Sequence, residues 1–172
     1  MSWQEIFKQP VTQTIASTAS GTLGVLRDMK RIESDGGEYR LVQAETSVAS
    51  GQIVQLGSTT AELSAASVVS KPLQVEPIVS SVHQVFGIMN CSSDSCAANG
   101  YFWCKVGGLA TIANAYKGTD AAISLNLPLA LNTDILVANY AATDQWPFGM
   151  PVSTVATNGA NVISVWLQGG GK

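Results

Sequence analysis

Short runs in which apolar and polar residues alternate recur from residue 22 onwards, and this period of two is typical of β-strands. Turn residues separate the runs, for example SDGG at 34–37 and NG at 99–100. The predicted strands are Thr22–Leu26, Tyr39–Ala44, Ile53–Leu56, Leu73–Val79, Val82–Met89, Tyr101–Val106, Leu109–Ala113, Ile135–Asn139, Val152–Ala156 and Asn161–Leu167. We therefore expect residues 22–172 to form one all-β domain, a compact antiparallel β-sandwich or barrel-like body.

The segment YFWCKVGGLATI at 101–112 contains two β-rich runs separated by Gly107 and Gly108. Two residues is the spacing of a tight hairpin, and glycines supply the positive φ angles that such a turn needs. A phosphate-binding loop would need a helix after the glycines, but LATIANAY alternates like a strand. The sequence therefore predicts a β-hairpin here.

Residues 1–21 break the pattern and predict an arm that carries a short helix. SWQE at 2–5 has the spacing of a capping box, and the helix must end before Pro10. One face of the helix would consist of Trp3, Ile6 and Phe7. A helix of two turns needs a surface to dock on. That surface is either the chain's own domain or another chain, because residues 11–22 read as an extended linker.

Charge is scarce and unevenly distributed. Hydrophobic residues make up 46% of the chain and charged residues 12%, and the first 46 residues hold 11 of the 21 charged side chains. The net charge of −3 does not indicate the basic surface that binding to nucleic acid requires. No apolar run is long enough to span a bilayer, and Glu5 and Lys8 interrupt any signal peptide. We expect a soluble protein with no nucleic-acid or membrane partner.

Two apolar runs, at 121–131 and 135–142, lack strict polar alternation, as expected for strands that are covered on both faces. A monomer of this size buries only part of its surface, so these runs predict a seam between subunits. The predicted seam residues are Ile123, Leu125, Leu127, Leu129, Leu131, Ile135, Val137 and Tyr140.

Candidate chemistry is sparse. His83, Cys91, Cys96 and Cys104 could form a zinc site, but no C-x₂-C pair preorganises two thiolates. Cys91 and Cys96 could close a disulfide, and the alternative is free thiols. His83 is the only histidine, no G-x-S-x-G motif is present, and most carboxylates fall in predicted turns. We expect no enzyme, no cofactor, no metal and no small-molecule substrate.

Several segments, taken in order, resemble the small β-rich decoration (cement) proteins of tailed-phage capsids. They are GGEYRLVQAETSVASGQIVQL at 36–56, VFGIMN at 85–90, GYFWCKVGGLATI at 100–112 and FGMPVSTVATNGANVISVWL at 148–167. The third is similar to the family's glycine- and aromatic-rich hairpin, and the fourth to its closing strand pair. The resemblance covers roughly residues 20–168.

The resemblance implies a non-enzymatic virion protein that is made in the host cytoplasm and sits on the capsid exterior. Family members are commonly trimers at threefold axes, where they clamp neighbouring major capsid subunits. It therefore implies the major capsid protein as partner and a homotrimer as the assembly. The arm residues Trp3, Ile6 and Phe7 are the predicted capsid contacts. The basic cluster Arg27, Lys30 and Arg31 could add contacts to an acidic capsid surface, or it could be a solvated loop.

A second interpretation is a receptor- or carbohydrate-binding β-sandwich, such as a fibre tip. Tyr140, Trp146 and Trp166 could form an aromatic platform for sugars. Alternatively, Trp166 packs into a core or a trimer seam, and Trp146 braces the turn before Pro147.

Overall fold

The computed structural model describes residues 8–15, 29–57, 73–79, 84–90, 95–118, 123–131, 137–140, 147–152 and 159–168, without the side chains of 114–118 and 159–161. Within these ranges the chain is built from β-strands, which confirms the predicted all-β class. The strands are β1 (Thr14–Ile15), β2 (Lys30–Ile32), β3 (Glu38–Ala44), β4 (Ile53–Leu56), β5 (Gln74–Pro77), β6 (Gly87–Met89), β7 (Tyr101–Gly118), β8 (Leu129–Leu131), β9 (Val137–Asn139), β10 (Gly149–Pro151) and β11 (Gly159–Gln168).

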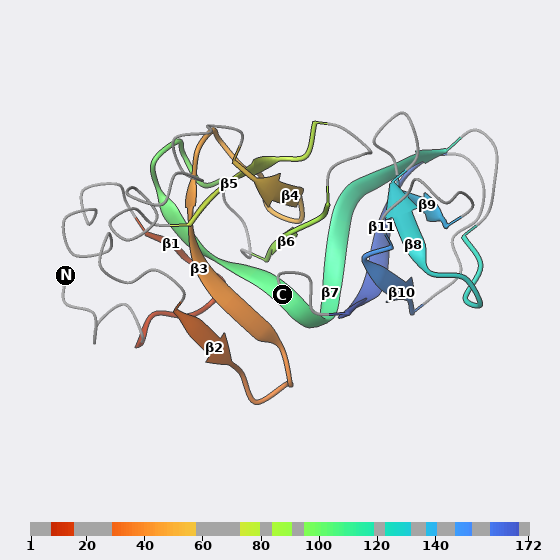
Figure 1. Cartoon of the computed structure of the whole chain (residues 1–172), viewed down its shortest axis with the longest axis horizontal. Coiled ribbons are helices and arrows are strands. Elements are labelled where there is room, and N and C mark those ends of the chain that lie inside the picture. Colours follow the sequence, from red (N-terminus) through yellow and green to blue (C-terminus); the bar gives the residue numbers. More distant parts are fainter. Residues whose placement is uncertain are drawn as a thin grey trace.

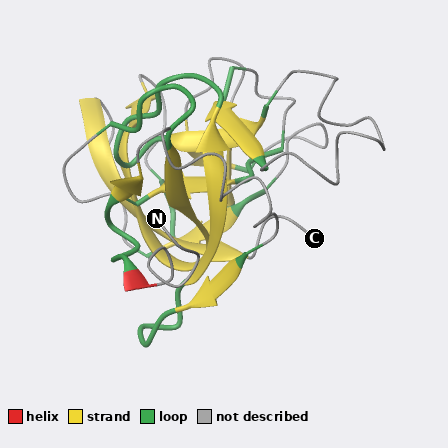
Figure 2. Ribbon diagram, turned by 90° about the vertical axis from the view of Figure 1, so that its left-hand side faces the viewer, coloured by secondary structure: helices red, strands yellow, loops and turns green. Residues whose placement is uncertain are grey.

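Five of the strands close into a barrel. β3 pairs with β5 in parallel, and antiparallel pairs then run through β4, β6 and the first half of β7 back to β3. Apolar side chains that alternate along the strands fill its interior, among them Val42, Val54, Val75, Met89, Phe102 and Cys104. Viewed from the barrel side, the strands curve around this core (Figure 2). The barrel-like form of the prediction is therefore the one observed.

β7 is one continuous strand of 18 residues, so the predicted hairpin at Gly107 and Gly108 is wrong. The chain bends at these glycines and does not turn back (Figure 1). Gly108 has a φ of +84°, and the register with β3 shifts here, which together mark a bulge. A side chain at Gly108 would meet the backbone of Gly36 and Gly37 at 3.1 Å. The glycines thus permit a kink and a close approach to the β2–β3 turn.

The second half of β7 leaves the barrel and begins an open antiparallel sheet, in the order β7–β11–β10–β8–β9. β11 pairs with β7 from Gly107 to Gly118, with one irregularity between Asn161 and Ile163. In Figure 1 this sheet lies on one side of the molecule and the barrel on the other, and β7 runs through both. The long strand is therefore the physical link between the two halves.

A shared core joins the barrel to the open sheet. Outward-facing Ile53 and Ile88 of the barrel pack with Ile112, Ile163 and other buried side chains of the sheet. The backbone adds a second link, since Ala113 N donates to Gly51 O at 3.0 Å. The two halves therefore form one folded unit.

A smaller core covers the outer surface of β3 and β7, where the N-terminal strands lie. It contains Ile15, Tyr39, Leu41, Tyr101 and Trp103, with Val11 and Met29 at its edge. Ile15 of β1 pairs with Tyr101. Residues 11–15, predicted to be part of a linker, are therefore a turn and a strand docked on the barrel. The predicted helix falls on residues outside the described ones, apart from Lys8 at its end, and stays a prediction.

Several predicted strand limits need correction. β10 ends at Pro151, so Val152 follows the strand where the prediction began one, and residues 153–156 lie outside the described residues, as does Thr22–Leu26. β1 and β2 were not predicted, because two or three residues are too few to show alternation, whereas β8 lies within the apolar run 121–131 that was expected to be a covered strand.

Candidate protein-binding face

The open sheet carries a row of apolar side chains on the face turned away from the core. Leu109 of β7, Trp166 of β11 and Met150 of β10 are direct cross-strand neighbours in register. Directly opposite residues on one face of an antiparallel sheet have adjacent side chains. These three residues therefore form one stripe across three strands.

A second row lies beside the first. Thr111 is opposite Ser164, and Val152 N donates to Ser164 O at 2.9 Å, so that Val152 follows on from the same row. Val162 is the next outward residue of β11. We call Leu109, Thr111, Met150, Val152, Val162, Ser164 and Trp166 together the outer face.

The alternation along β11 explains why these side chains point outward. Ile163, Val165 and Leu167 are buried in the shared core, so Val162, Ser164 and Trp166 must point to the opposite side. β10 is held close, because a Cβ on Gly149 would meet Val165 Cγ2 at 2.6 Å. Glycine at 149 thus permits β10 to lie tightly against β11.

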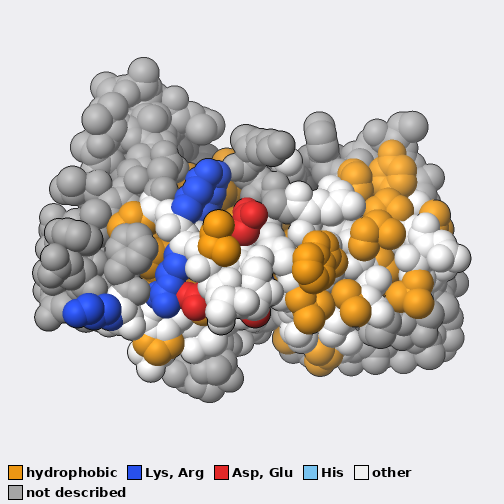
Figure 3. Space-filling model, turned by 90° about the horizontal axis from the view of Figure 1, so that it is seen from below, with side chains coloured by type: hydrophobic (Ala, Val, Ile, Leu, Met, Phe, Trp, Pro, Cys, Tyr) orange, Lys and Arg blue, Asp and Glu red, His pale blue; other side chains and the backbone are white. Residues whose placement is uncertain are grey.

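The outer face is apolar and exposed. Trp166 is 53% exposed and Val162 63%, and Leu109 and Val152 are each about half exposed. No described side chain from Val106 onwards carries a charge at neutral pH. Figure 3 shows hydrophobic side chains gathered on the half that holds β10 and β11, and the charged ones in view lie on the other half. Exposed apolar patches of this kind mark protein-binding surfaces.

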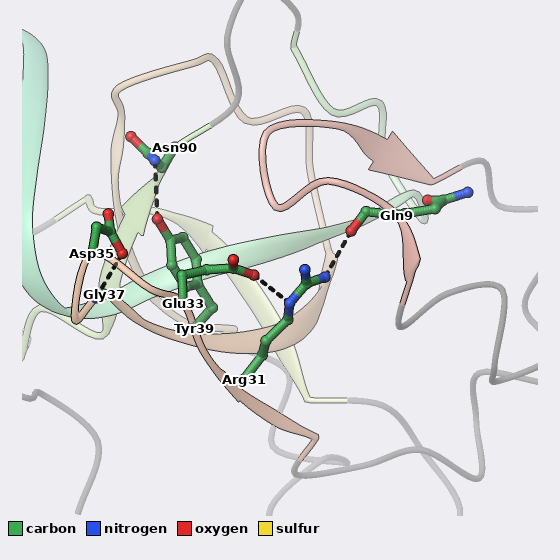
Figure 4. Close-up of polar contacts among 7 residues, drawn as sticks. All are labelled: Gln9, Arg31, Glu33, Asp35, Gly37, Tyr39 and Asn90. Atoms are coloured by element: carbon green, nitrogen blue, oxygen red, sulfur yellow. Dashed lines mark hydrogen bonds and ion pairs between the residues drawn. The ribbon is translucent and has the colours of Figure 1, made fainter.

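The charged half holds its polar side chains in internal contacts. Arg31 Nη1 donates to Gln9 O at 2.7 Å, and the guanidinium also forms an ion pair with Glu33 (Figure 4). The same guanidinium lies 5.9 Å from the centre of the Trp103 ring. Arg31 therefore joins the N-terminal segment to β2 and β7.

A turn contact next to this cluster involves the buried Lys105. Its Nζ lies 3.5 Å from Asp35 Oδ2 and 5.1 Å from the centre of the Tyr39 ring. Gly37 N donates to Asp35 Oδ1 at 2.9 Å, and this hydrogen bond, with Lys105 as a further cause, lowers the pKa of Asp35. Asn90 Nδ2 donates to the Tyr39 hydroxyl at 3.4 Å (Figure 4).

Buried polar side chains on the outer surface of the barrel pair with one another. Gln74 Nε2 donates to Gln43 Oε1 at 2.8 Å, and Gln55 Nε2 donates to Glu76 Oε1 at 2.9 Å. Gln43 Nε2 also donates to Asn99 O at 3.1 Å. The polar atoms of this group have partners within the barrel half.

The predicted capsid contacts fall into three groups. Trp3, Ile6, Phe7 and Arg27 lie outside the described residues. Lys30 is exposed on β2, with Arg40 of β3 as its cross-strand partner. Arg31 is half-buried and held by internal contacts, which is a structural role that the sequence did not suggest.

The predicted seam residues separate in a different way. Four of them are buried in the chain's own core and out of reach of a second subunit: Ile123, Leu129, Leu131 and Val137. Leu125 and Leu127 are exposed in the turn before β8, and Tyr140 is half-buried. Ile135 is outside the described residues. Apolar runs without alternation were therefore mostly core, and the trimer itself stays a prediction.

The outer face could have been found by the same criterion. The run NVISVWL at 161–167 lacks polar alternation, which indicates cover on both faces of the strand. The structure covers only one of these faces. Trp166 is not in the core, which corrects that alternative, and its place in a seam stays a prediction. Trp146 lies outside the described residues.

Cys96 and Cys104 are free thiols inside the barrel. Burial raises the pKa of Cys96 to about 11, so this thiol stays protonated at neutral pH and is a poor metal ligand or nucleophile. His83 and Cys91 lie outside the described residues. In the described part of the chain, no group of three or more His, Cys, Asp or Glu is placed to hold a metal ion. The described residues also include no helix long and apolar enough to cross a bilayer.

Comparison with known proteins gives one structural likeness to report. No family model and no curated protein matches the sequence. The structure is similar to the N base of the head fiber protein gp8.5 of bacteriophage phi29, with a TM-score of 0.46 and 7% sequence identity. The match covers 78% of this chain and 96% of that one. A likeness at this level does not establish a common fold or a common function.

Proposed function

We propose that the chain is a structural protein of a tailed-phage virion, bound to the outside of the capsid. The observation that carries the proposal is the outer face, an exposed apolar surface that lacks charged side chains. A surface of this composition works by binding protein, because its apolar area is stabilised when water is removed from it. The resemblance of four sequence segments to capsid decoration proteins supports the capsid as the assembly.

A protein can stabilise a capsid shell by binding to it, without catalysing any reaction. A protein that binds only the assembled shell shifts the equilibrium towards that state by mass action. Full burial of one Leu or Phe side chain contributes about 1.5–3 kcal/mol, so a few such contacts per subunit are enough. Many copies around a shell would then clamp neighbouring major capsid subunits. We further propose that copies of the chain associate with one another on the shell.

The outer face would take part in contacts between proteins of the assembly, and the contact with the capsid itself would use the opposite end of the molecule. Lys30 is exposed on the barrel half beside Arg40 and can approach an acidic surface. The arm with Trp3, Ile6 and Phe7 precedes this half in the sequence and offers apolar anchors. Contacts of the lysine would weaken with salt, whereas those of the arm would not.

A pelleting assay tests the proposal. The purified full chain is mixed with empty shells of the phage that encodes it, and we expect saturable co-sedimentation and a higher melting temperature of the shells. The variant Phe7→Ser should bind more weakly, and Val79→Ser, at an exposed position of the barrel half, is the matched control. A chain that neither pellets with the shells nor raises their melting temperature would exclude the proposed function.

Exposed Trp166 favours one alternative, a carbohydrate-binding module. An indole ring on a flat sheet can stack on a sugar ring. A glycan array with the isolated chain tests this alternative directly. Sugar binding that is lost in Trp166→Ala, together with no binding to shells, would replace the virion role with a lectin role.

A further inference from the structure

β11 carries large apolar side chains on both sides, yet the chain itself covers only one of them. Ile163, Val165 and Leu167 fill the shared core, whereas Val162 and Trp166 point outward and are more than half exposed. Antiparallel sheets with one solvated face normally place polar residues on it. We propose that the outer face is covered by the same face of a second copy of this chain. The inference rests on the proposed function and adds to it the surface at which copies meet.

Charge favours a second copy over a different protein. A desolvated charge without a partner is costly, so a charge-free face selects a partner surface that is also charge-free. The outer face meets that condition with itself as far as the structure describes it, because none of its seven residues carries a charge. Among the described surfaces of the chain, the outer face itself has this property, so the same face on another copy is a suitable partner.

The barrel half does not offer such a surface. Its described side chains include Lys30, Glu33, Asp35 and Glu38, which are exposed or half-exposed. Symmetric contact of this half with itself would remove these charges from water, which costs stability unless each one meets an opposite charge. Self-association is therefore directed to the open sheet.

The arrangement of large and small side chains on the outer face suits sheet-on-sheet packing. Large side chains occupy one row, Leu109, Trp166 and Met150, and the adjacent row begins with the smaller Thr111 and Ser164. Two such sheets pack about 10 Å apart when large side chains of one fit over small ones of the other. Tryptophan and methionine are also the types enriched at the centres of protein interfaces.

The test is the mass of the full-length chain in solution. Light scattering across a range of concentrations should give twice 18.0 kDa, because a face that packs on the same face of another copy forms a twofold pair. Trp166→Lys and Val162→Lys add a charge to each copy of the outer face and should return the mass to 18.0 kDa. Val79→Lys adds the same charge at an exposed apolar position of the barrel half and should leave the oligomer unchanged.

A second variant separates dissociation from misfolding. Thr111 is polar and exposed within the outer face, so Thr111→Lys removes no core contact and should dissociate the oligomer while circular dichroism keeps the native spectrum. An oligomer that survives both Thr111→Lys and Val162→Lys would overturn the inference. So would a wild-type chain that stays at 18.0 kDa at every concentration.

The pelleting assay distinguishes a failure of the second-copy inference from a failure of the proposed function. If the wild-type chain is monomeric and Thr111→Lys abolishes binding to shells, the outer face contacts a capsid protein, which overturns the second copy but not the virion role. If the lysine variants are monomeric and no form of the chain binds shells, the second copy stands and the virion role fails.

Discussion

Trp103 and Trp166 lie on adjacent strands, β7 and β11, but they belong to two differently built halves of the molecule. Trp103 is completely buried against the barrel, beneath β1 and the guanidinium of Arg31. Trp166 is 53% exposed on a sheet face whose described side chains carry no charge. The barrel half completes its own cover with N-terminal segments, whereas the open sheet leaves one apolar face uncovered.

The difference shows where the chain is self-sufficient. In the barrel half, buried polar groups pair with one another, as Gln55 does with Glu76 at 2.9 Å. In the open sheet, apolar residues occupy solvent-exposed positions, where polar residues are normally found. This contrast supports the proposal that the open sheet binds a partner, whereas buried polar groups of the barrel half, such as Gln55 and Glu76, are paired within the chain.

The largest expected effect is a difference in the free energy of unfolding between alanine variants of the two tryptophans. Trp103→Ala leaves a cavity in a closed core and should lower the free energy of unfolding by about 3–5 kcal/mol. Trp166→Ala should change it by less than about 1 kcal/mol at low protein concentration, because the side chain is already half in water. Chemical denaturation of both variants measures the contrast. Equal losses would contradict the description of the outer face as exposed.

The second-largest loss of stability is expected from a substitution at the junction between the two halves. Gly51 has a φ of +74°, and a Cβ there would lie 2.5 Å from Ala113 Cβ and 2.8 Å from Ala113 N. Gly51→Ala should therefore lower the free energy of unfolding by about 2–4 kcal/mol, through strain and overlap together.

Gly36→Ala is the matched control for that junction. Gly36 has a similar φ of +77° but nothing within 4 Å of an added Cβ, so strain alone should cost about 1 kcal/mol. If the two alanine variants lose equal stability in denaturation, the close approach of Gly51 to β7 does not matter.

The smallest expected effect is a dependence of stability on acidic pH, and it arises in the barrel half. The Gly37 backbone N–H and then Lys105 lower the pKa of Asp35 below its ordinary value of 3.8. A lowered folded pKa gives stability that is present above pH 3.8 and is lost as the pH falls through the folded value. The stability difference between wild type and Asp35→Asn should therefore shrink as the pH falls below 3.8. A difference that stays constant between neutral pH and pH 2 would contradict this assignment.

Alternation of residues predicted the all-β class and most of the longer strands, because the period of two is set locally by the pleat. The path of β7 could not be predicted in this way. Two glycines allow both a tight turn and a kink, and the strands available to pair with each side decide between them. β3 and β11 each pair with part of β7, so the strand continues through Gly107 with a kink and does not turn back.

The site was harder to predict for a related reason. A strand covered on both faces reads as continuously apolar, whether the cover is the chain's own core or a partner. Leu129 and Leu131 are covered by their own chain, and Trp166 is not, yet their sequence contexts look alike. Only the three-dimensional arrangement separates the two cases.

The most direct test of the central claim is to label side chains with hydroxyl radicals in assembled particles and in the free Thr111→Lys chain. Met150 and Trp166 are both readily oxidised and both lie on the outer face. If a partner covers this face, both residues should be strongly protected in particles and labelled in the variant. Equal labelling of Met150 and Trp166 in the two samples would contradict the claim that the open sheet is built to be covered by another protein.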